Sequence, residues 1–298
     1  MNKLMRFQSN LFMLISCLAL TLGFGVAVND NLYILYIALG FIVLLGVPHG
    51  SLDVLFASQT YQLGQISHWM KFIAYYVLAS LAVILVWLIV PNFFFIAFLI
   101  LSALHFSDDL NLIDSEVLKF GYGASIITFP SLFFSAELIQ LYGMIINVEI
   151  ATTIVKASQL ISLPAGLLIT IQLFKKQIDI RIKLESLCVC ALFLLLTPIL
   201  SFGIYFCVMH SARHLIRSRF FLRKFTGQAF LNALILPTIA VVLIGLLILW
   251  VGSTKTLEGE MIRIIFIGLA ALTVPHAWVL QKSNFHTWSI TCNSKDSH

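Results

Sequence analysis

Residues 228–251 read QAFLNALILPTIAVVLIGLLILWV, a stretch that carries no charged side chain. A hydrocarbon core about 30 Å thick needs about 20 consecutive apolar residues in a helix, so this stretch predicts a transmembrane helix. Similar stretches recur along the chain, in which 60% of residues are apolar and 10% are charged, with a mean hydropathy of +1.00. A soluble protein cannot bury that much apolar surface, so the composition indicates an all-α, polytopic bundle of transmembrane helices.

The apolar runs predict about ten spans, within a range of roughly eight to ten. Their expected bounds are 11–28, 32–56, 71–90, 93–107, 117–135, 138–156, 158–174, 186–210, 228–251 and 262–281. Glu149 and Lys156 interrupt the stretch 135–174, and Pro164 can bend or break a helix there. That stretch holds two spans, one bent span, or an interfacial helix with one span. We expect a single transmembrane domain over 1–281 and a polar tail over 282–298.

The basic residues of short loops predict the orientation, because Lys and Arg favour the cytoplasmic side. Lys3 and Arg6 therefore place the N-terminus in the cytoplasm, together with the basic segment 213–224. The basic segment 175–183 then falls outside, because one predicted span separates the two segments. The net charge of +5 suits lipid headgroups and topology better than nucleic acid, so no nucleic-acid partner is expected.

Five of the eight histidines lie within or at the end of apolar runs. They are His49, His105, His210, His214 and His276. An ionisable side chain at membrane depth costs a few kcal/mol and by default marks a functional site. Each of the five falls near the C-terminal end of an even-numbered predicted span, so all five are expected at one depth. His68, His286 and His298 fall in loops or the tail and are given no role.

The spacing of these histidines favours metal binding. In HSARH, His210 and His214 are four residues apart, which places both imidazoles on one helix face. In PHGSLD, Asp53 follows His49 at the same spacing and would either orient a ligating imidazole or bind the metal itself. In LHFSDD, His105 precedes two carboxylates.

Each motif alone also has a plain structural explanation. HSARH can be a basic helix end, PHG a kinked helix end, and His276 beside Trp278 part of an interfacial aromatic belt. The coincidence of four or five histidines at one depth favours the metal hypothesis over these separate explanations. All-imidazole coordination suits iron, copper or zinc, and the sequence has no HExxH motif of a zinc protease.

At PHGSLD, LHFSDD, HSARH and VPHAW the sequence resembles the Brp/Blh family of membrane proteins, the β-carotene 15,15′-dioxygenases that supply retinal to microbial rhodopsins. The resemblance covers nearly the whole chain and implies a polytopic enzyme in the plasma membrane of a prokaryote. Its reaction would be cleavage of the central 15,15′ double bond of β-carotene with O2 to give two molecules of retinal. The enzyme would be surrounded by membrane lipid, and a retinal-binding rhodopsin would use its product.

The resemblance also implies a site. Ferrous iron would be held by four residues, His49, His105, His210 and His214. Asp53 would support these ligands, and His276 matches a family histidine that is either substrate-side or structural. Because β-carotene resides in the bilayer, we expect a lateral entrance between helices.

Two other functions compete with this interpretation. A di-iron membrane desaturase or hydroxylase also gathers histidines at span ends, but it needs an HxxHH box that this sequence lacks. A transporter or a retinal-binding accessory protein would use buried histidines to relay protons or line a pore.

Overall fold

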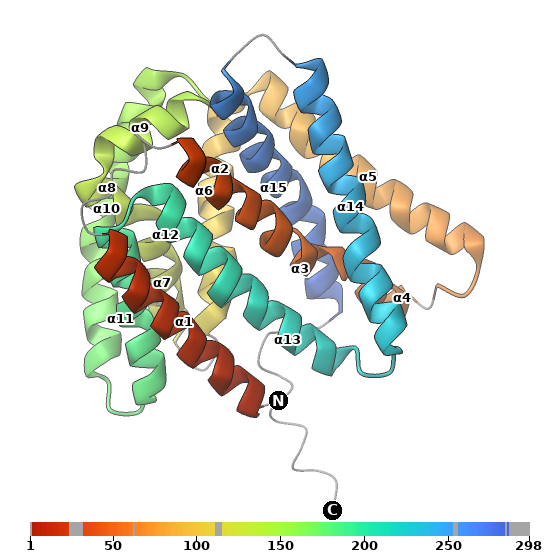
Figure 1. Ribbon diagram of the computed structural model, residues 1–298, viewed down its shortest axis with the longest axis horizontal. Helices are drawn as coiled ribbons and strands as arrows, with labels where there is room; N and C mark the ends of the chain where they lie inside the picture. The colour runs from red at the N-terminus through yellow and green to blue at the C-terminus, as the bar shows by residue number, and fades with distance from the viewer. Residues whose placement is uncertain are drawn as a thin grey trace, which may run out of the picture.

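A computed structural model describes residues 2–23, 32–61, 63–110, 115–252, 256–283 and 285. Within these ranges the chain is helical and contains no strand, which confirms the all-α prediction (Figure 1). The predicted tail 282–298 lies outside the described residues except for 282, 283 and 285. The helices are α1 (Asn2–Gly23), α2 (Leu32–Phe41), α3 (Pro48–Ser51), α4 (Asp53–Tyr61), α5 (Ile66–Ile89), α6 (Pro91–Ser107), α7 (Glu116–Thr128), α8 (Pro130–Phe133), α9 (Ser135–Gly143), α10 (Val148–Phe174), α11 (Ile180–Leu195), α12 (Pro198–Ile204), α13 (Ala212–Phe221), α14 (Gly227–Val251) and α15 (Leu257–Lys282).

The described residues contain eight helices, some bent, that are long and apolar enough to cross a membrane. A ninth is added if the bent pair Glu116–Phe133 and Ser135–Gly143 counts as one span. This agrees with the predicted polytopic bundle and with the lower part of its range. The two helices α5 and α14 bury almost none of their apolar length inside the protein, so both face the surrounding lipid.

The irregular stretch 135–174 does not form the two predicted spans 138–156 and 158–174. A single helix, α10, runs through Pro164; it covers all of 158–174 but only residues 148–156 of the other predicted span, whose first part lies in the short helix α9. Membrane helices tolerate an internal proline because neighbouring groups satisfy the freed backbone. The helix starts at Val148 because the Asn147 side chain accepts a hydrogen bond from the Glu149 amide at 2.8 Å.

The predicted span 186–210 is also wrong, because the chain breaks there into two helices. Helix α11 ends at Leu195, and α12 begins at Pro198. Leu196 and Thr197 are extended, with ψ of 155° and 148°. For Thr197 the reason is Pro198, because the residue before a proline is pushed out of the helical region. The chain then reverses, so that α11 runs upward and α12–α13 run downward in Figure 1.

This reversal corrects the expected orientation of the basic segments. The Arg181 guanidinium donates a hydrogen bond to Asn10 Oδ1 at 2.9 Å, and Arg213 Nε donates to Gln8 Oε1 at 3.2 Å. Segments 175–183 and 213–224 therefore lie at the same end of the bundle as the start of α1 (Figure 1). Placing the first of them on the opposite side was wrong, and the observed arrangement puts all three basic segments on one side, as the rule for Lys and Arg prefers.

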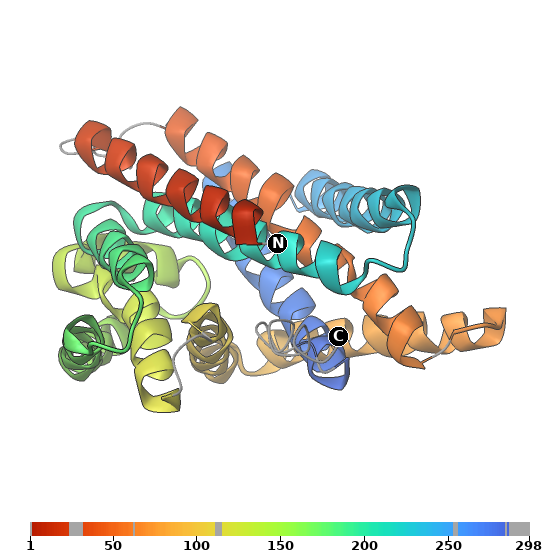
Figure 2. The same ribbon diagram turned by 90° about the horizontal axis from the view of Figure 1, so that it is seen from below.

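Two short π-helical turns lie side by side at the centre of the bundle. One, Ile42–Gly46, joins α2 to the segment before α3, and the other, Tyr205–Ser211, joins α12 to α13. A Cβ at Gly46 would lie only 2.2 Å from a ring carbon of Phe206, so only glycine permits this approach. Helix α1 lies along the second turn and α13 (Figure 2). Single π-helical turns are frequent at functional sites.

Gly123 is expected to be essential for the contact between α6 and α7. A Cβ at this position would lie 1.9 Å from the Ala103 carbonyl oxygen, so Gly123→Ala must push the two helices apart. We expect a loss of about 1–3 kcal/mol of stability, read as a lower thermal midpoint in detergent. Gly40→Ala is the matched control, because no atom lies within 4 Å of its Cβ. Equal midpoints for the two variants would contradict this packing.

Candidate metal centre

Five helical segments deliver the five membrane-depth histidines to one place. His49 follows the first π-helical turn in α3, His105 lies in the last turn of α6, and His210 lies in the second π-helical turn. His214 lies in the first turn of α13, and His276 follows Pro275 in α15. Neighbouring ring centroids are 4.8–5.9 Å apart. Four of the five rings are buried, and the His105 ring is half-buried.

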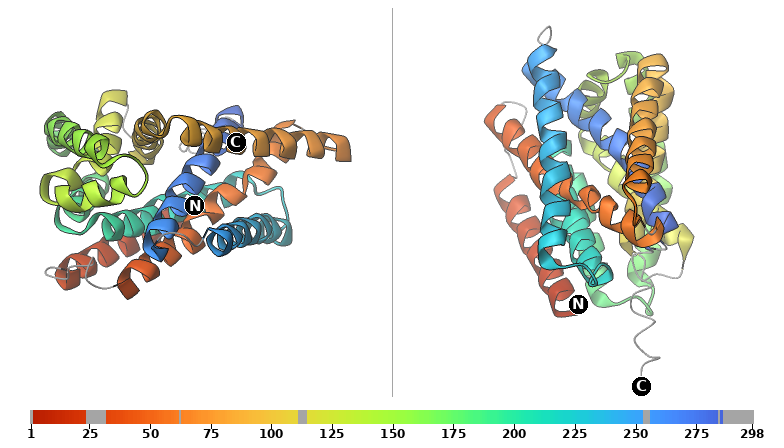
Figure 3. Two further views of the ribbon diagram at one scale, coloured as in Figure 1. Left: turned by 90° about the horizontal axis from the view of Figure 1, so that it is seen from above. Right: turned by 90° about the vertical axis from the view of Figure 1, so that its right-hand side faces the viewer.

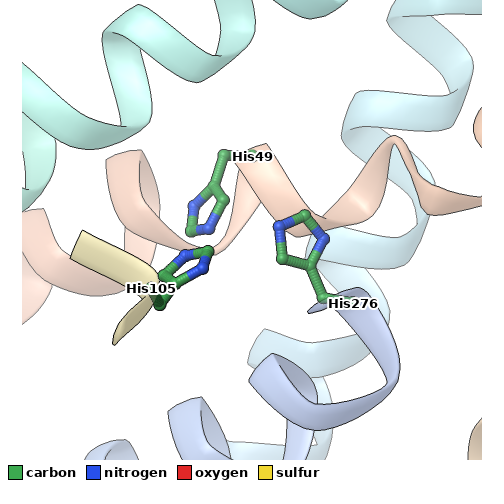
Figure 4. Close-up of side chains that lie close together, drawn as sticks. All are labelled: His49, His105 and His276. Atoms are coloured by element: carbon green, nitrogen blue, oxygen red, sulfur yellow. The ribbon is translucent and has the colours of Figure 1, made fainter. Parts of the chain in front are cut away.

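The most compact group within this cluster includes a histidine that the resemblance left outside the ligand set. His49, His105 and His276 each offer a ring nitrogen, and these nitrogens all lie within 4.8 Å of one another. Figure 4 shows the three rings turned toward one another from three different elements. His210 joins them, because its Nε2 lies 3.1 Å from His105 Nε2. The ring of His276 therefore lies as close to its neighbours as the rings of the four histidines that the resemblance implies as ligands.

Carboxylates hold two of the rings by the nitrogen that faces away from the cluster. His210 Nδ1 donates to Asp109 Oδ2 at 3.1 Å, and His276 Nδ1 donates to Asp53 Oδ1 at 2.7 Å. A ring whose Nδ1 carries the proton presents a lone pair at Nε2. Both carboxylates therefore favour the tautomer that a metal ligand requires.

Neutral groups hold two further rings in the same way. His49 Nδ1 contacts the Gly46 carbonyl oxygen, and Ser211 Oγ lies 3.2 Å from the same nitrogen. His214 Nδ1 lies 3.3 Å from Ser218 Oγ. A carbonyl oxygen only accepts hydrogen bonds, so the proton of His49 sits on Nδ1 and its Nε2 is free to bind a cation.

Two observations indicate that the arrangement of the imidazoles fits a metal ion. The Nε2 atoms of His214 and His276 are buried and have no hydrogen-bond partner among the described residues, although an unpaired buried polar atom is costly. The 3.1 Å between the Nε2 atoms of His105 and His210 matches two ligands at right angles, about 3 Å apart for bond lengths of about 2.1 Å. A cation inside the cluster would give such lone pairs a partner, and imidazole suits iron, copper or zinc.

Asp109 is a site residue that the sequence pattern did not single out. It lies in the short turn Asp108–Leu110 after α6, and it accepts a hydrogen bond from the Tyr205 hydroxyl in addition to its bond with His210. Its signal in the sequence was the spacing of four from His105, the same as Asp53 from His49. In both cases the carboxylate pairs with a histidine from another helix, which spacing alone does not reveal.

A cavity of about 720 Å³ begins at the cluster. His49, His105 and His276 line it together with Asp53, while His210 and His214 are not among its lining residues. Most of the other lining side chains are aliphatic or aromatic. The histidine cluster is therefore one polar patch on the wall of an otherwise apolar cavity, which suits a largely apolar ligand.

A family model described as beta-carotene 15,15′-dioxygenase matches residues 41–283, a range that contains all five clustered histidines. The chain belongs to the β-carotene 15,15′-dioxygenase family. A protein of the uncultured marine bacterium 66A03 that is named beta-carotene 15,15′-dioxygenase is 28% identical over 252 residues, covering 80% of this chain and 90% of the relative. No solved structure matches the chain.

In this member of the β-carotene 15,15′-dioxygenase family, Asp109 is expected to set metal affinity through His210. Asp109→Asn keeps the shape but removes the negative charge that favours the required tautomer, so we expect metal affinity to fall about 10- to 100-fold. A metal titration of the purified protein measures this. Asp108→Asn changes the exposed neighbouring carboxylate and should bind metal like the wild type. Equal affinities for both variants would show that Asp109 does not act on the site.

Proposed function

We propose that this protein uses iron to cleave the central 15,15′ double bond of β-carotene with O2, giving two molecules of retinal. The observation that carries the proposal is the cluster of five imidazoles at the wall of a large apolar cavity, inside a bundle of membrane helices. Family membership and the bacterial relative support the substrate and the reaction. The chain would act in a prokaryotic plasma membrane and supply retinal to a rhodopsin.

The proposed ligands are His49, His105, His210 and His214, with His276 as a fifth imidazole on the cavity side. Ferrous iron, when bound there, would supply the redox chemistry by which O2 reacts with an alkene. Asp53 would hold His276 in place. This set extends the four-histidine set implied by the resemblance, because the ring nitrogens of His276, His49 and His105 lie within 4.8 Å of one another.

The protein's own contribution is position and the exclusion of water. Phe206 stacks on the His210 ring with centroids 5.7 Å apart, and Phe106 packs edge-on against the same ring at 5.1 Å. These contacts fix the imidazole and keep its surroundings apolar. A polyene lying in the cavity would pass beside His49, His105 and His276, where its double bonds come close to the cluster. An apolar wall that faces lipid also keeps water from reactive species.

Expression in cells that make β-carotene tests the proposal. We expect those cells to lose β-carotene and to form retinal as the only cleavage product, whereas cells without the chain form none. Chromatography of the extracted pigments measures both compounds. A transporter or a retinal-binding accessory protein would leave β-carotene uncleaved, so unchanged β-carotene at full expression of the chain would reject the proposed activity.

A further inference from the structure

On one side, the side chains that line the cavity are buried within the protein. Six lining residues there come from α7, α9, α11 and α12, and each is less than 10% exposed. They are Ile126, Leu138, Leu141, Tyr142, Phe193 and Ile199. We call this part the blind arm. Because its lining side chains also form part of the main apolar core, a molecule in the blind arm has no way out on that side.

On the opposite side, the lining residues of the cavity are also surface residues. Val77 of α5 and Ile244 of α14 both line the cavity, yet they are 48% and 57% exposed. Ile73 and Leu81 lie one helical turn before and after Val77, and they too line the cavity and are exposed. A side chain that borders a cavity and is half-exposed marks a rim, so the cavity opens toward lipid between α5 and α14. We call this opening the mouth.

Both helices of the mouth are attached close to the histidines. The Tyr76 hydroxyl of α5 donates to Asp53 Oδ2 at 2.8 Å, and Asp53 also holds His276. Thr238 Oγ1 of α14 lies 2.8 Å from Ser51 Oγ in α3. Both helices also pack against α15 (Figure 1), and the right-hand view of Figure 3 shows them in separate layers. The mouth therefore opens beside the metal centre.

We propose that the carotenoid enters end first, through the mouth between α5 and α14, until its leading end group fills the blind arm. This inference rests on the proposed function and adds the route and the orientation of the substrate. The middle of the polyene then lies at His49, His105 and His276, and the trailing end group remains in the mouth next to lipid. The leading end group is limited in size by the blind arm, whereas the trailing end group is not.

Carotenoids with a bulky group on one or both ends test this asymmetry. The probes are β-carotene, a carotenoid with a fatty-acyl ester on one ring, and a carotenoid with such esters on both rings. We expect cleavage of the first two and none of the third, because one unmodified end must enter the blind arm. Cleavage of the doubly esterified probe would show a channel open at both ends. Rejection of the singly esterified probe would show a site closed at both ends, and either result overturns the proposal.

Tryptophan substitutions test the position of the mouth. Val77→Trp and Ile244→Trp should narrow it, and the matched controls are Leu78→Trp and Leu243→Trp, which change neighbouring lipid-facing residues that do not line the cavity. For the mouth variants we expect an apparent KM for β-carotene about tenfold higher with unchanged kcat, and no change for the controls. Equal KM values in all four variants would place the entrance elsewhere.

Binding to the metal-free protein gives a second measurement that does not depend on catalysis. β-Carotene is achiral, so the visible circular dichroism that it gains in a chiral pocket reports binding. In lipid nanodiscs this signal should develop more slowly for Val77→Trp and Ile244→Trp than for their controls. If the wild type forms no retinal, the proposed function fails; if it forms retinal and the variants match their controls, only the mouth is rejected.

Discussion

Replacing His210 with alanine is expected to remove both bound iron and retinal formation. The His210 ring lies at the centre of the cluster, with its Nε2 3.1 Å from His105 Nε2 and its Nδ1 bonded to Asp109. The substitution deletes one proposed ligand and removes the histidine that donates a hydrogen bond to the buried Asp109 carboxylate. Iron affinity should therefore fall by more than about 100-fold, which is the upper loss expected when a group that only orients a ligand is removed.

Iron analysis of the purified protein and retinal formation in carotene-producing cells measure this effect. His68→Ala is the control, since His68 lies exposed at the start of α5, outside the cluster. It should keep wild-type iron content and activity. The thermal midpoint of both variants without metal shows whether His210→Ala is folded. Full activity of a folded His210→Ala variant would exclude His210 as a ligand.

His276→Ala should have the second largest effect on iron binding and retinal formation, because of where the His276 ring lies. Its Nε2 is buried without a hydrogen-bond partner among the described residues, and its ring nitrogens lie within 4.8 Å of those of His49 and His105. We expect iron affinity to fall at least about tenfold and retinal formation to fall with it. Among the described residues, the substitution also leaves Tyr76 as the remaining hydrogen-bond partner of Asp53.

The iron titration separates the two roles of His276 that the sequence left open. A histidine that only contacts substrate would leave iron binding at the wild-type level and change the KM for β-carotene. Phe72→Leu is a matched control on the cavity wall, because Phe72 lines the same cavity and offers no metal ligand. Wild-type iron affinity in His276→Ala would remove this histidine from the proposed ligand set.

The apolar runs predicted the class of fold because the hydrocarbon thickness imposes span length directly on the sequence. They predicted the helix breaks poorly. Pro164 sits inside α10, while Pro198 ends the extended link after α11, and local sequence does not distinguish these two prolines. The two errors offset each other. One long helix, α10, stands where two spans were predicted over 138–174, and the predicted span 186–210 is replaced by α11 and α12–α13. The direction of α13 and α15 along the bundle therefore stays as predicted (Figure 1).

The site was predictable in part for a similar reason. The cost of placing a histidine at membrane depth marks all five residues in the sequence, whatever their partners are. The pairs His210–Asp109 and His276–Asp53 join residues 101 and 223 positions apart. Such contacts depend on how the helices pack, and the spacing of four between His49 and Asp53 did not indicate that Asp53 pairs with His276. The cavity is likewise a property of the packed bundle that no motif encodes.

X-ray absorption at the iron edge of the purified, iron-loaded protein shows how many metal ions the histidine cluster holds and which atoms surround them. We expect one iron per chain, surrounded mainly by imidazole nitrogens, and we expect that signal to be lost in His210→Ala. Two irons per chain with an iron–iron distance, or a single iron surrounded by oxygen atoms alone, would contradict this expectation.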